Sequence, residues 1–494
     1  MQSHASPTTD PATWLDELAQ RRPEQLFLRT PDGQHITYAA MRQRVEHMAA
    51  ALAQRSVVAG DRVVAQVEKS PDAIALYLAC LRLGAVFVPL NTAYTTAEID
   101  YFLGDADPKI AVGVASGVSL AELARDRSGS DRSADIAQSE LAALLYTSGT
   151  TGRSKGAMLT RSNLSSNAFT LAQAWRFKES DVLLHALPIF HVHGLFVAIN
   201  TVLAAGSSML FLPKFDADEV VRSLPEATVM MGVPTFYTRL LQHPGFTRER
   251  CASVRLFVSG SAPLLATTHR EFRARTGHAI LERYGMSETL MNTSNPYEGE
   301  RVPGSVGPPL AGIEVRIAEP ESGVPLPEPE SVGMIEVRGP NVFRGYWRMP
   351  EKTAAEFRKD GFFITGDVGR FDRNGYLFIV GRAKDLIISG GFNVYPAEVE
   401  TELDALSGVA ESAVIGVPHP DFGEGVTAVV VARAGATLDE NTLRTALEQR
   451  LAKFKLPKRV VFVSEMPRNA MGKVQKAQLR ELYRDLYNPA RRQH

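Results

Sequence analysis

The stretch Tyr146-Thr-Ser-Gly-Thr-Thr-Gly-Arg-Ser-Lys-Gly156 combines glycines, small hydroxyl side chains and one lysine. It follows the apolar run 141–145, which predicts a buried strand, and it precedes a segment in which Thr160 or Ser162 could cap a helix. Glycines let backbone amides close around a phosphate, hydroxyls donate hydrogen bonds to its oxygens, and a lysine adds positive charge. The pattern therefore predicts a loop that binds polyphosphate.

The spacing differs from a Walker A loop, in which Gly-Lys-Ser/Thr follows a glycine and four further residues. Here Lys155 lies between Ser154 and Gly156. A cluster of Gly, Ser and Thr is also typical of an exposed turn. The choice between these two interpretations depends on motifs elsewhere in the chain.

Length and composition indicate an ordinary globular protein. The 494 residues allow two to four domains, and 45% of them are hydrophobic and 22% charged. Lys and Arg number 54 against 55 Asp and Glu, so the basic excess of a nucleic-acid-binding protein is missing. The two cysteines, Cys80 and Cys251, exclude a disulfide framework and fit a reducing compartment.

The sequence gives no sign of targeting to a membrane. Its first ten residues lack the basic and apolar regions of a signal peptide or a basic transit peptide. No run reaches the roughly 18 apolar residues that a membrane span needs. We therefore expect a cytoplasmic protein whose partners are neither membranes nor nucleic acids.

The order of apolar segments predicts an α/β fold. Strand-like and helix-like segments alternate up to about residue 300, which is typical of doubly wound, mostly parallel sheets with helices on both faces. From Gly304 short strands separated by Gly and Pro predict a small β-barrel or sandwich. After Asp385 a mixed α+β unit begins. We expect an N-terminal domain over 1–384, with a β-rich subdomain at 304–384, and a small mobile domain over 385–494.

Several motifs occur together in one order along the chain: Tyr146–Gly156, Tyr284-Gly-Met-Ser-Glu-Thr289, Thr365-Gly-Asp367, Gly381-Arg-Ala-Lys-Asp385 and Pro467-Arg-Asn-Ala-Met-Gly-Lys473. In this order they resemble the adenylate-forming enzymes, which include acyl-CoA synthetases, luciferases and peptide-synthetase adenylation domains. The resemblance covers nearly the whole chain. One departure is Ser154, where the family often has Pro, and it should alter loop stiffness more than chemistry.

The resemblance implies a reaction in two half-steps with ATP, Mg²⁺ and coenzyme A. A carboxylate attacks the α-phosphate of ATP to give an acyl-adenylate and pyrophosphate, and a thiol then displaces AMP. Attack by an anion on a polyanion requires compensating charge and strict orientation.

The resemblance also assigns roles residue by residue. Glu288 should bind Mg²⁺, Thr289 should touch the α-phosphate, and Lys473 should reach both the substrate carboxylate and the α-phosphate. The expected ATP- and AMP-binding residues are Thr147, Ser148, Gly149, Thr150, Thr151, Gly152, Lys155, Ser261, Ala262, Tyr284, Gly285, Met286, Thr289, Asp367, Arg382 and Lys473. Within this set, Tyr284, Ser261 and Ala262 should frame adenine, while Asp367 and Arg382 should bind the ribose.

The resemblance gives the C-terminal unit a mechanical role. Lys473 should act in the first half-step, and Gly390 and Gly391 should leave room for the pantetheine arm of coenzyme A in the second. Rotation about Asp385 would withdraw Lys473 from the active site and bring Gly390 and Gly391 to it. Acetylation of Lys473 would remove its charge and stop the first half-step.

The acid is indicated by Arg283, which directly precedes Tyr284. An unpaired buried guanidinium is costly, whereas a second substrate carboxylate would pair with it. His191 could assist, and the surrounding sequence is similar to malonyl-CoA synthetases, which also accept methylmalonate. Two alternatives stay open for these side chains: Arg283 could pair with Glu282, and His185, His191 and His193 could simply pack at a strand end or, less readily, bind a metal.

Three functions follow from the sequence. The first is ligation of malonate, and also methylmalonate, to coenzyme A. The second is activation of another short acid, or loading of a carrier protein, although no carrier domain follows Lys473. The third, outside the family, is nucleotide binding without turnover.

Overall fold

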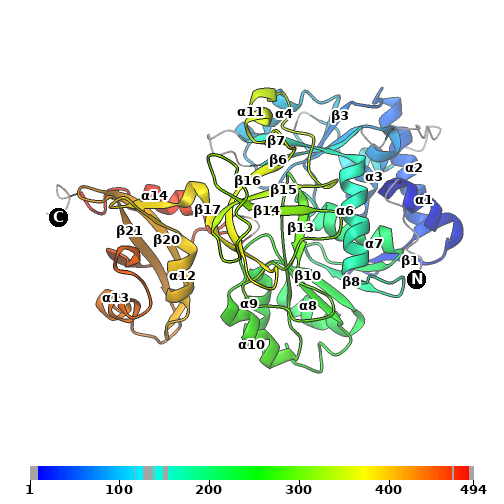
Figure 1. Ribbon diagram of the computed structural model, residues 1–494. Helices are drawn as coiled ribbons and strands as arrows, with labels where there is room; N and C mark the ends of the chain where they lie inside the picture. Colours follow the sequence, from blue (N-terminus) through cyan, green and yellow to red (C-terminus); the bar gives the residue numbers. More distant parts are fainter. Residues whose placement is uncertain are drawn as a thin grey trace.

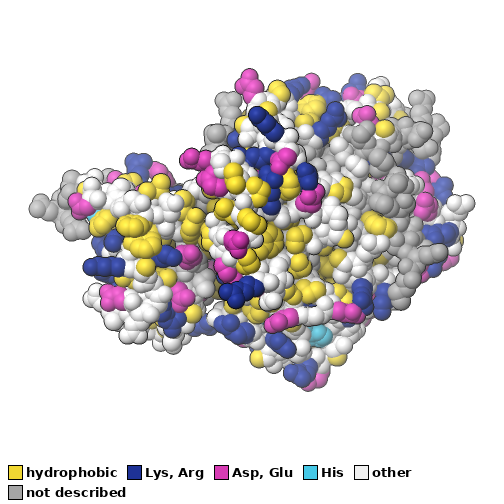
Figure 2. Space-filling view, viewed as in Figure 1, with side chains coloured by type: hydrophobic (Ala, Val, Ile, Leu, Met, Phe, Trp, Pro, Cys, Tyr) yellow, Lys and Arg dark blue, Asp and Glu magenta, His cyan; other side chains and the backbone are white. Residues whose placement is uncertain are grey.

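The structure is a computed structural model that describes residues 9–115, 117–125, 137, 140–147, 154–469 and 472–488. Its described part forms a larger lobe and a smaller lobe, with helix α1 (Pro11–Arg21) and helix α14 (Lys476–Tyr483) on opposite sides of the molecule (Figure 1). Acidic and basic side chains are mixed over the face seen in Figure 2, in keeping with a net charge of −1. No helix of the described residues has the length and apolar character needed to cross a membrane.

The larger lobe contains two mostly parallel sheets, as the alternating sequence pattern predicts. One has the order β5-β3-β4-β6-β7 and the other β13-β12-β11-β10-β8-β9-β1-β2. Antiparallel strands close one end of the first sheet (β7) and both ends of the second (β13 and β2). The strands are β1 (Leu26–Arg29), β2 (His35–Thr37), β3 (Arg62–Ala65), β4 (Val86–Pro89), β5 (Ile110–Val112), β6 (Leu141–Thr147), β7 (Lys155–Thr160), β8 (Val182–His185), β9 (Ser208–Phe211), β10 (Val229–Gly232), β11 (Leu256–Ser259), β12 (Leu281–Met286) and β13 (Leu290–Ser294).

The helices of this lobe pack on its sheets, and local sequence signals fix their ends. Helix α3 (Pro71–Leu83) begins at the Ser70 cap with Pro at its first position and ends at Gly84 in a left-handed conformation. A seven-residue π-helix (His193–Ile199) runs directly into α7. Such helices are rare in proteins, and those that occur are frequently found at functional sites. The other helices are α1 (Pro11–Arg21), α2 (Tyr38–Gln54), α4 (Thr96–Ala106), α5 (Leu120–Arg125), α6 (Arg161–Ala174), α7 (Asn200–Ala205), α8 (Ala217–Ser223), α9 (Pro234–Gln242), α10 (Ala266–Thr276) and α11 (Pro350–Ala355).

The β-rich stretch contains a four-stranded antiparallel sheet in the order β14-β15-β16-β17. These strands are β14 (Glu314–Ala318), β15 (Gly333–Arg338), β16 (Phe363–Phe371) and β17 (Leu377–Arg382). Its outer strands β14 and β17 are not paired with each other, so the sheet is open rather than a closed barrel. Four strands are too few to close around a filled interior, which takes about eight.

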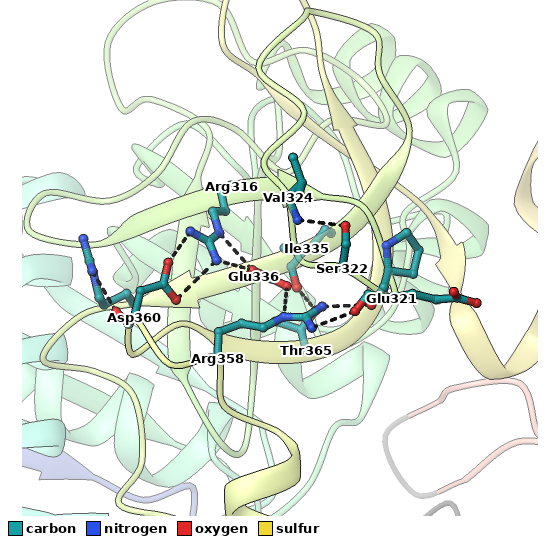
Figure 3. Close-up of polar contacts among 11 residues, drawn as sticks. Arg316, Glu321, Ser322, Val324, Ile335, Glu336, Arg358, Asp360 and Thr365 are labelled. Carbon is teal, nitrogen blue, oxygen red and sulfur yellow. Dashed lines mark hydrogen bonds and ion pairs between the residues drawn. The ribbon is translucent and has the colours of Figure 1, made fainter.

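A buried acid organises this sheet. Glu336 on β15 is fully buried, and it accepts hydrogen bonds from Arg316 at 2.8 Å and Arg358 at 2.7 Å (Figure 3). Arg316 also pairs with Asp360 at 2.6 Å, and the Thr365 hydroxyl donates to the Ile335 carbonyl at 2.8 Å. These contacts fix β16, and they fix the segment that leads into it from α11.

The smaller lobe has its own sheet and its own apolar core. Strands β19, β18, β21 and β20 are neighbours in that order, and β22 pairs with β21. Buried Val, Leu and Ile side chains fill both faces of this sheet. The elements are β18 (Ile387–Ser389), β19 (Phe392–Val394), α12 (Pro396–Asp404), β20 (Val409–His419), β21 (Gly423–Ala432), α13 (Glu440–Glu448), β22 (Arg459–Phe462) and α14 (Lys476–Tyr483).

Candidate active site

The predicted adenosine end of the site lies where β12 faces β16 and β17. The Tyr284 hydroxyl donates to one oxygen of Asp367 at 2.6 Å, and the Arg382 guanidinium pairs with the other oxygen at 3.0 Å. Asp367 and Arg382 are cross-strand partners in the β16–β17 ladder, so the sheet register itself brings them together. Tyr284, Asp367 and Arg382, which belong to the predicted adenine and ribose residues, therefore form one connected cluster.

The turn after β11 and the turn after β12 carry the remaining predicted adenine residues. Ser261 has a φ of 73°, a strained conformation for a non-glycine residue that is commonly found at functional sites. A Cβ at Gly285 would lie 1.8 Å from the Leu290 carbonyl oxygen, so this glycine is required for the close β12–β13 pairing. Met286 accepts a backbone hydrogen bond from Thr289 at 3.2 Å, which closes the turn that presents Glu288. Ala262 lies partly exposed beside Ser261.

The predicted phosphate loop belongs to a hairpin between β6 and β7, with Thr147 opposite Lys155 in the register. The sequence indicates the strand before the loop but not the strand after it, and helix α6 begins only beyond β7, capped by Thr160. The predicted phosphate contacts Ser148, Gly149, Thr150, Thr151 and Gly152 lie outside the described residues.

Thr147 and Lys155 both meet acidic side chains. The Thr147 hydroxyl donates to Glu288 at 3.4 Å, and the Lys155 ammonium pairs with Glu356 at 3.3 Å. The Thr289 hydroxyl is fully buried and lacks a hydrogen-bond partner among the described residues. A buried hydroxyl without a partner is costly unless a ligand supplies one, which fits its predicted role at the α-phosphate.

Glu288 fits a magnesium site built mainly from ligand oxygens. Its carboxylate is 6% exposed, and burial raises its pKa, because the charged form loses hydration. No group of three His, Cys, Asp or Glu in the described ranges could hold a metal. Mg²⁺ usually takes one or two carboxylates together with phosphates and water, so a single carboxylate beside the phosphate loop fits that ion.

Arg283 is a buried guanidinium without a carboxylate partner among the described residues. It is 3% exposed, its Nε and one terminal nitrogen have no hydrogen-bond partner, and burial lowers its pKa to about 9. Glu282 does not pair with it: Glu282 points to the other face of β12 and accepts from the Gly304 amide at 3.3 Å. A Cβ at Gly260 would lie 2.4 Å from the Arg283 guanidinium carbon, so Gly260 makes room for this side chain.

The histidines of the turn before the π-helix lie beside this guanidinium and are neutral. Burial and the Arg283 charge lower the pKa of His191 to about 4. The same two causes hold the pKa of His193 well below its usual value. His193 contacts the Ser261 hydroxyl at 3.2 Å, while its Nε2 is buried and has no partner in the described structure. His191 Nδ1 accepts from the His193 amide at 3.3 Å, and the pocket role that the sequence predicts for His191 stays a prediction.

Lys69 is a buried lysine that the sequence did not reveal, and burial holds its pKa well below the usual value. Its Nζ contacts His185 Nδ1 at 2.8 Å and the His185 carbonyl oxygen at 2.9 Å, and it lies 4.4 Å from the centre of the Phe211 ring. His185 Nε2 lies 2.8 Å from the Gly194 carbonyl oxygen, so Nε2 carries the proton and Nδ1 accepts from Lys69. This chain ties the end of β8 to the start of the π-helix.

The smaller lobe brings Lys473 to the site and leaves Gly390 and Gly391 away from it. Burial, together with the Arg382 charge, lowers the pKa of Lys473 to about 8. A Cβ at the neighbouring Gly472 would lie 2.8 Å from Thr235 on α9. Gly390 and Gly391 are exposed, with φ of 59° and 82°. Asp385, the predicted hinge, pairs with Arg480 of α14 at 2.9 Å.

Comparison with known proteins identifies the family. The family model described as AMP-binding enzyme matches residues 15–347, and that of the AMP-binding enzyme C-terminal domain matches residues 398–473. A feruloyl-CoA synthase from an Amycolatopsis species is 36% identical over 489 residues, covering 95% of this chain and 98% of that protein. The mitochondrial malonate–CoA ligase ACSF3 of Mus musculus is 37% identical over 463 residues, covering 83% and 79%.

A solved structure extends the likeness to both lobes. The crystal structure of ATP-bound MatB from Rhodopseudomonas palustris superposes with a TM-score of 0.93 at 55% identity, covering 97% of this chain and all of the other. A match over both lobes at this level includes the segments that carry the adenosine cluster and Lys473. The chain belongs to the AMP-binding enzyme family and is an AMP-forming acid–CoA ligase, which joins an acid to coenzyme A through an acyl-adenylate.

Proposed function

We propose that the acid is malonate and that methylmalonate is also accepted. The observation that carries this proposal is the Arg283 guanidinium, which is buried with two unpartnered nitrogens beside the unpartnered His193 Nε2. An acid with a single carboxylate would leave these donors unsatisfied, at a cost of about 1–3 kcal/mol for each. A short dicarboxylic acid would satisfy them with its distal carboxylate while its proximal carboxylate reacts. The family relationship alone does not choose the acid, because similar proteins include both a feruloyl-CoA synthase and a malonate–CoA ligase.

In the proposed first half-step, the distal carboxylate binds Arg283 and accepts a hydrogen bond from neutral His193. Lys473 lies at the other end of the acid, where its charge offsets the repulsion between the attacking carboxylate and the α-phosphate. Thr289 donates its free hydroxyl to the α-phosphate. Each of these groups is held by the fold before the substrate arrives, so little reorganisation accompanies the reaction.

The nucleotide is held at both of its ends. The adenosine cluster of Tyr284, Asp367 and Arg382 binds base and ribose, while Thr147 and Lys155 bind the outgoing phosphates. Mg²⁺ on Glu288 would neutralise part of the triphosphate charge when bound. In the second half-step, we propose rotation about Asp385 that withdraws Lys473 and brings Gly390 and Gly391 to the acid pocket. Acetylation of Lys473 would then block only the first half-step.

The test is pyrophosphate release with a panel of acids, measured with and without coenzyme A. Malonate and methylmalonate should give the highest kcat/KM, with acetate, butyrate, succinate and ferulate as the comparison acids. Thioester should accumulate only when coenzyme A is present, which separates this function from carrier loading. A preference for a monocarboxylic acid would disprove the assignment of the substrate, whereas a failure to release pyrophosphate with every acid would leave only nucleotide binding.

A further inference from the structure

Two residues that the proposed mechanism does not use connect Lys155 to Glu288. The Tyr346 hydroxyl lies 2.8 Å from one oxygen of Glu356 and 3.1 Å from one oxygen of Glu288. The Lys155 ammonium pairs with the other oxygen of Glu356 at 3.3 Å and lies 4.1 Å from the centre of the Tyr346 ring. Lys352 pairs with the same Glu356 oxygen at 2.7 Å. Tyr346 therefore stands between two carboxylates, one of which already holds two ammonium groups.

The hydroxyl between the two acids has one proton to donate. It lies within hydrogen-bond distance of both carboxylates, so it can donate to only one of them at a time. Glu356 has Lys155 and Lys352 as counter-ions, whereas Glu288 forms no ion pair within the described residues and accepts from the hydroxyls of Thr147 and Tyr346. The group that is short of positive charge is thus Glu288, the proposed metal ligand.

Backbone contacts fix both Tyr346 and Glu356 relative to the strand that carries Lys155. The amide of Trp347 donates to the Gly156 carbonyl at 2.8 Å, and the Tyr346 amide donates to the Thr353 hydroxyl at 2.9 Å. The Glu356 carbonyl accepts from Ile364 of β16 at 2.9 Å. Two residues further on, Arg358 is held by the buried Glu336 (Figure 3). The acidic pair is therefore built into the fold and is not a chance encounter of surface side chains.

We propose that Glu356 is the counter-ion that Lys155 exchanges for the ATP triphosphate, and that Tyr346 keeps Glu288 oriented toward the metal during this exchange. The Lys155 side chain is 9% exposed, and a buried ammonium without a counter-ion is strongly unfavourable. Glu356 is the counter-ion that holds that ammonium in place while the site is empty of nucleotide. When the triphosphate binds, Lys155 turns to it and Lys352 remains with Glu356. The inference rests on the proposed phosphate roles of Lys155 and Glu288.

The first measurement is equilibrium binding of a fluorescent ATP analogue in EDTA, with neither acid nor coenzyme A, so that no turnover occurs. Glu356→Gln should tighten this metal-free binding roughly three- to tenfold. In this variant Lys155 does not have to break an ion pair before it binds the triphosphate, and the negative charge that repels the triphosphate is removed. The matched control is Glu351→Gln, an exposed acid on the same helix α11, which should change binding less than about twofold because exposed charges are screened. In the Lys155→Met background, the effect of Glu356→Gln should fall to the level of this control.

The second measurement concerns Tyr346. Tyr346→Phe keeps the ring beside the Lys155 ammonium and removes only the hydroxyl. We expect metal-free binding to be unchanged and the Mg²⁺ concentration for half-maximal binding to rise by roughly three- to tenfold, as for the loss of one charge-assisted hydrogen bond. Thermal melting of each variant verifies that it is folded.

The outcomes separate this inference from the proposed function. If Lys155→Met weakens ATP binding while Glu356→Gln leaves it unchanged or weaker, the exchange is wrong and the phosphate assignment stands. If Lys155→Met has no effect on ATP binding, the phosphate assignment and the exchange fail together. A Tyr346→Phe protein with wild-type Mg²⁺ dependence would remove the role given to the hydroxyl.

Discussion

Replacing Arg283 with Met should make the folded protein more stable and nearly inactive toward malonate. In most proteins a buried Arg has a carboxylate partner, and removing the Arg leaves an unpaired charge. Arg283 has no such partner in the described structure, so Met would remove an uncompensated charge from the interior. The expected gain in stability and loss of activity have one cause, because the site is built to receive its missing anion from the substrate.

The lowered pKa gives a scale for the gain. A fall from roughly 12.5 to about 9 corresponds to roughly 5 kcal/mol at ~1.36 kcal/mol for each tenfold change in proton affinity. The guanidinium is charged in both the folded and the unfolded chain below pH 9, so this cost is fully present at neutral pH. Because Met packs imperfectly in a space shaped for Arg, we expect a net gain of about 2 kcal/mol.

The assay is thermal melting, and the control is Arg255→Met. Arg255 pairs with the buried Asp181 at 2.5 Å, so its removal should cost about 3–5 kcal/mol. With an unreactive ATP analogue present, saturating malonate should stabilise the wild type by about 2.7 kcal/mol at one hundred times its Kd. Malonate should not stabilise Arg283→Met, so adding malonate should reverse the order of the two melting temperatures. If Arg283→Met melts as early as Arg255→Met and still releases pyrophosphate with malonate, the reasoning is refuted.

Three further predictions address the same region. Gly260→Ala should push the Arg283 guanidinium out of place and lower kcat/KM for malonate at least roughly tenfold, about 1.4 kcal/mol, with the KM for ATP unchanged; an equal loss with a monocarboxylic acid would contradict this. Pyrophosphate release should decline above about pH 8 as Lys473 loses its proton, and a kcat/KM profile that is flat to high pH would exclude Lys473 as the cation. Lys69→Met should loosen the turn that His185 holds and raise the KM for malonate several-fold, about 1 kcal/mol for one buried hydrogen bond, with kcat and the KM for ATP nearly unchanged; a uniform loss of kcat would indicate general misfolding.

Much of the fold could be predicted because its signals are local. The α3 segment carries a capping Ser, a first-turn Pro and a terminal Gly, and the structure begins and ends that helix accordingly. Strand β7 was missed because Lys155–Thr160 mixes polar and small residues, and its strand character comes from pairing with β6 and with the 345–347 segment. The predicted barrel was an open sheet, since strand number alone does not show which edges meet.

The site shows a similar division. The structure brings Tyr284, Asp367 and Arg382 into contact, and Lys473 lies near the charges of Arg382 and Asp367. The roles that the motif order assigns to these residues stay predictions. Lys69, His193, Tyr346 and Glu356 lie outside the quoted motifs, and their roles depend on contacts between residues far apart in the chain. In the sequence, nothing distinguishes Lys69 and Glu356 from ordinary charged residues on the surface. Their partners can be identified only from the structure: Lys69 contacts His185 at the end of β8, and Glu356 pairs with Lys155 of β7 and Lys352 of α11.

Some of the buried side-chain atoms without a hydrogen-bond partner in the described structure belong to Arg283, His193 and Thr289, three residues of the proposed site, while others lie elsewhere in the chain. The Arg283 nitrogens and His193 Nε2 lack partners where we propose that the acid binds, and the Thr289 hydroxyl lacks one at the predicted α-phosphate position. Lys155, by contrast, is satisfied by Glu356. A fold stabilised only by its own contacts would pair all of these groups in the same way. The donors proposed to bind the acid have no partner, which favours selection of a dianion by its charge. The lysine proposed to bind phosphate is already paired with a carboxylate, so ATP is favoured only when its triphosphate can displace that carboxylate. On this reasoning the two substrates are recognised by different electrostatic means, and substitutions at Arg283 and at Glu356 should change the affinities for malonate and for ATP independently.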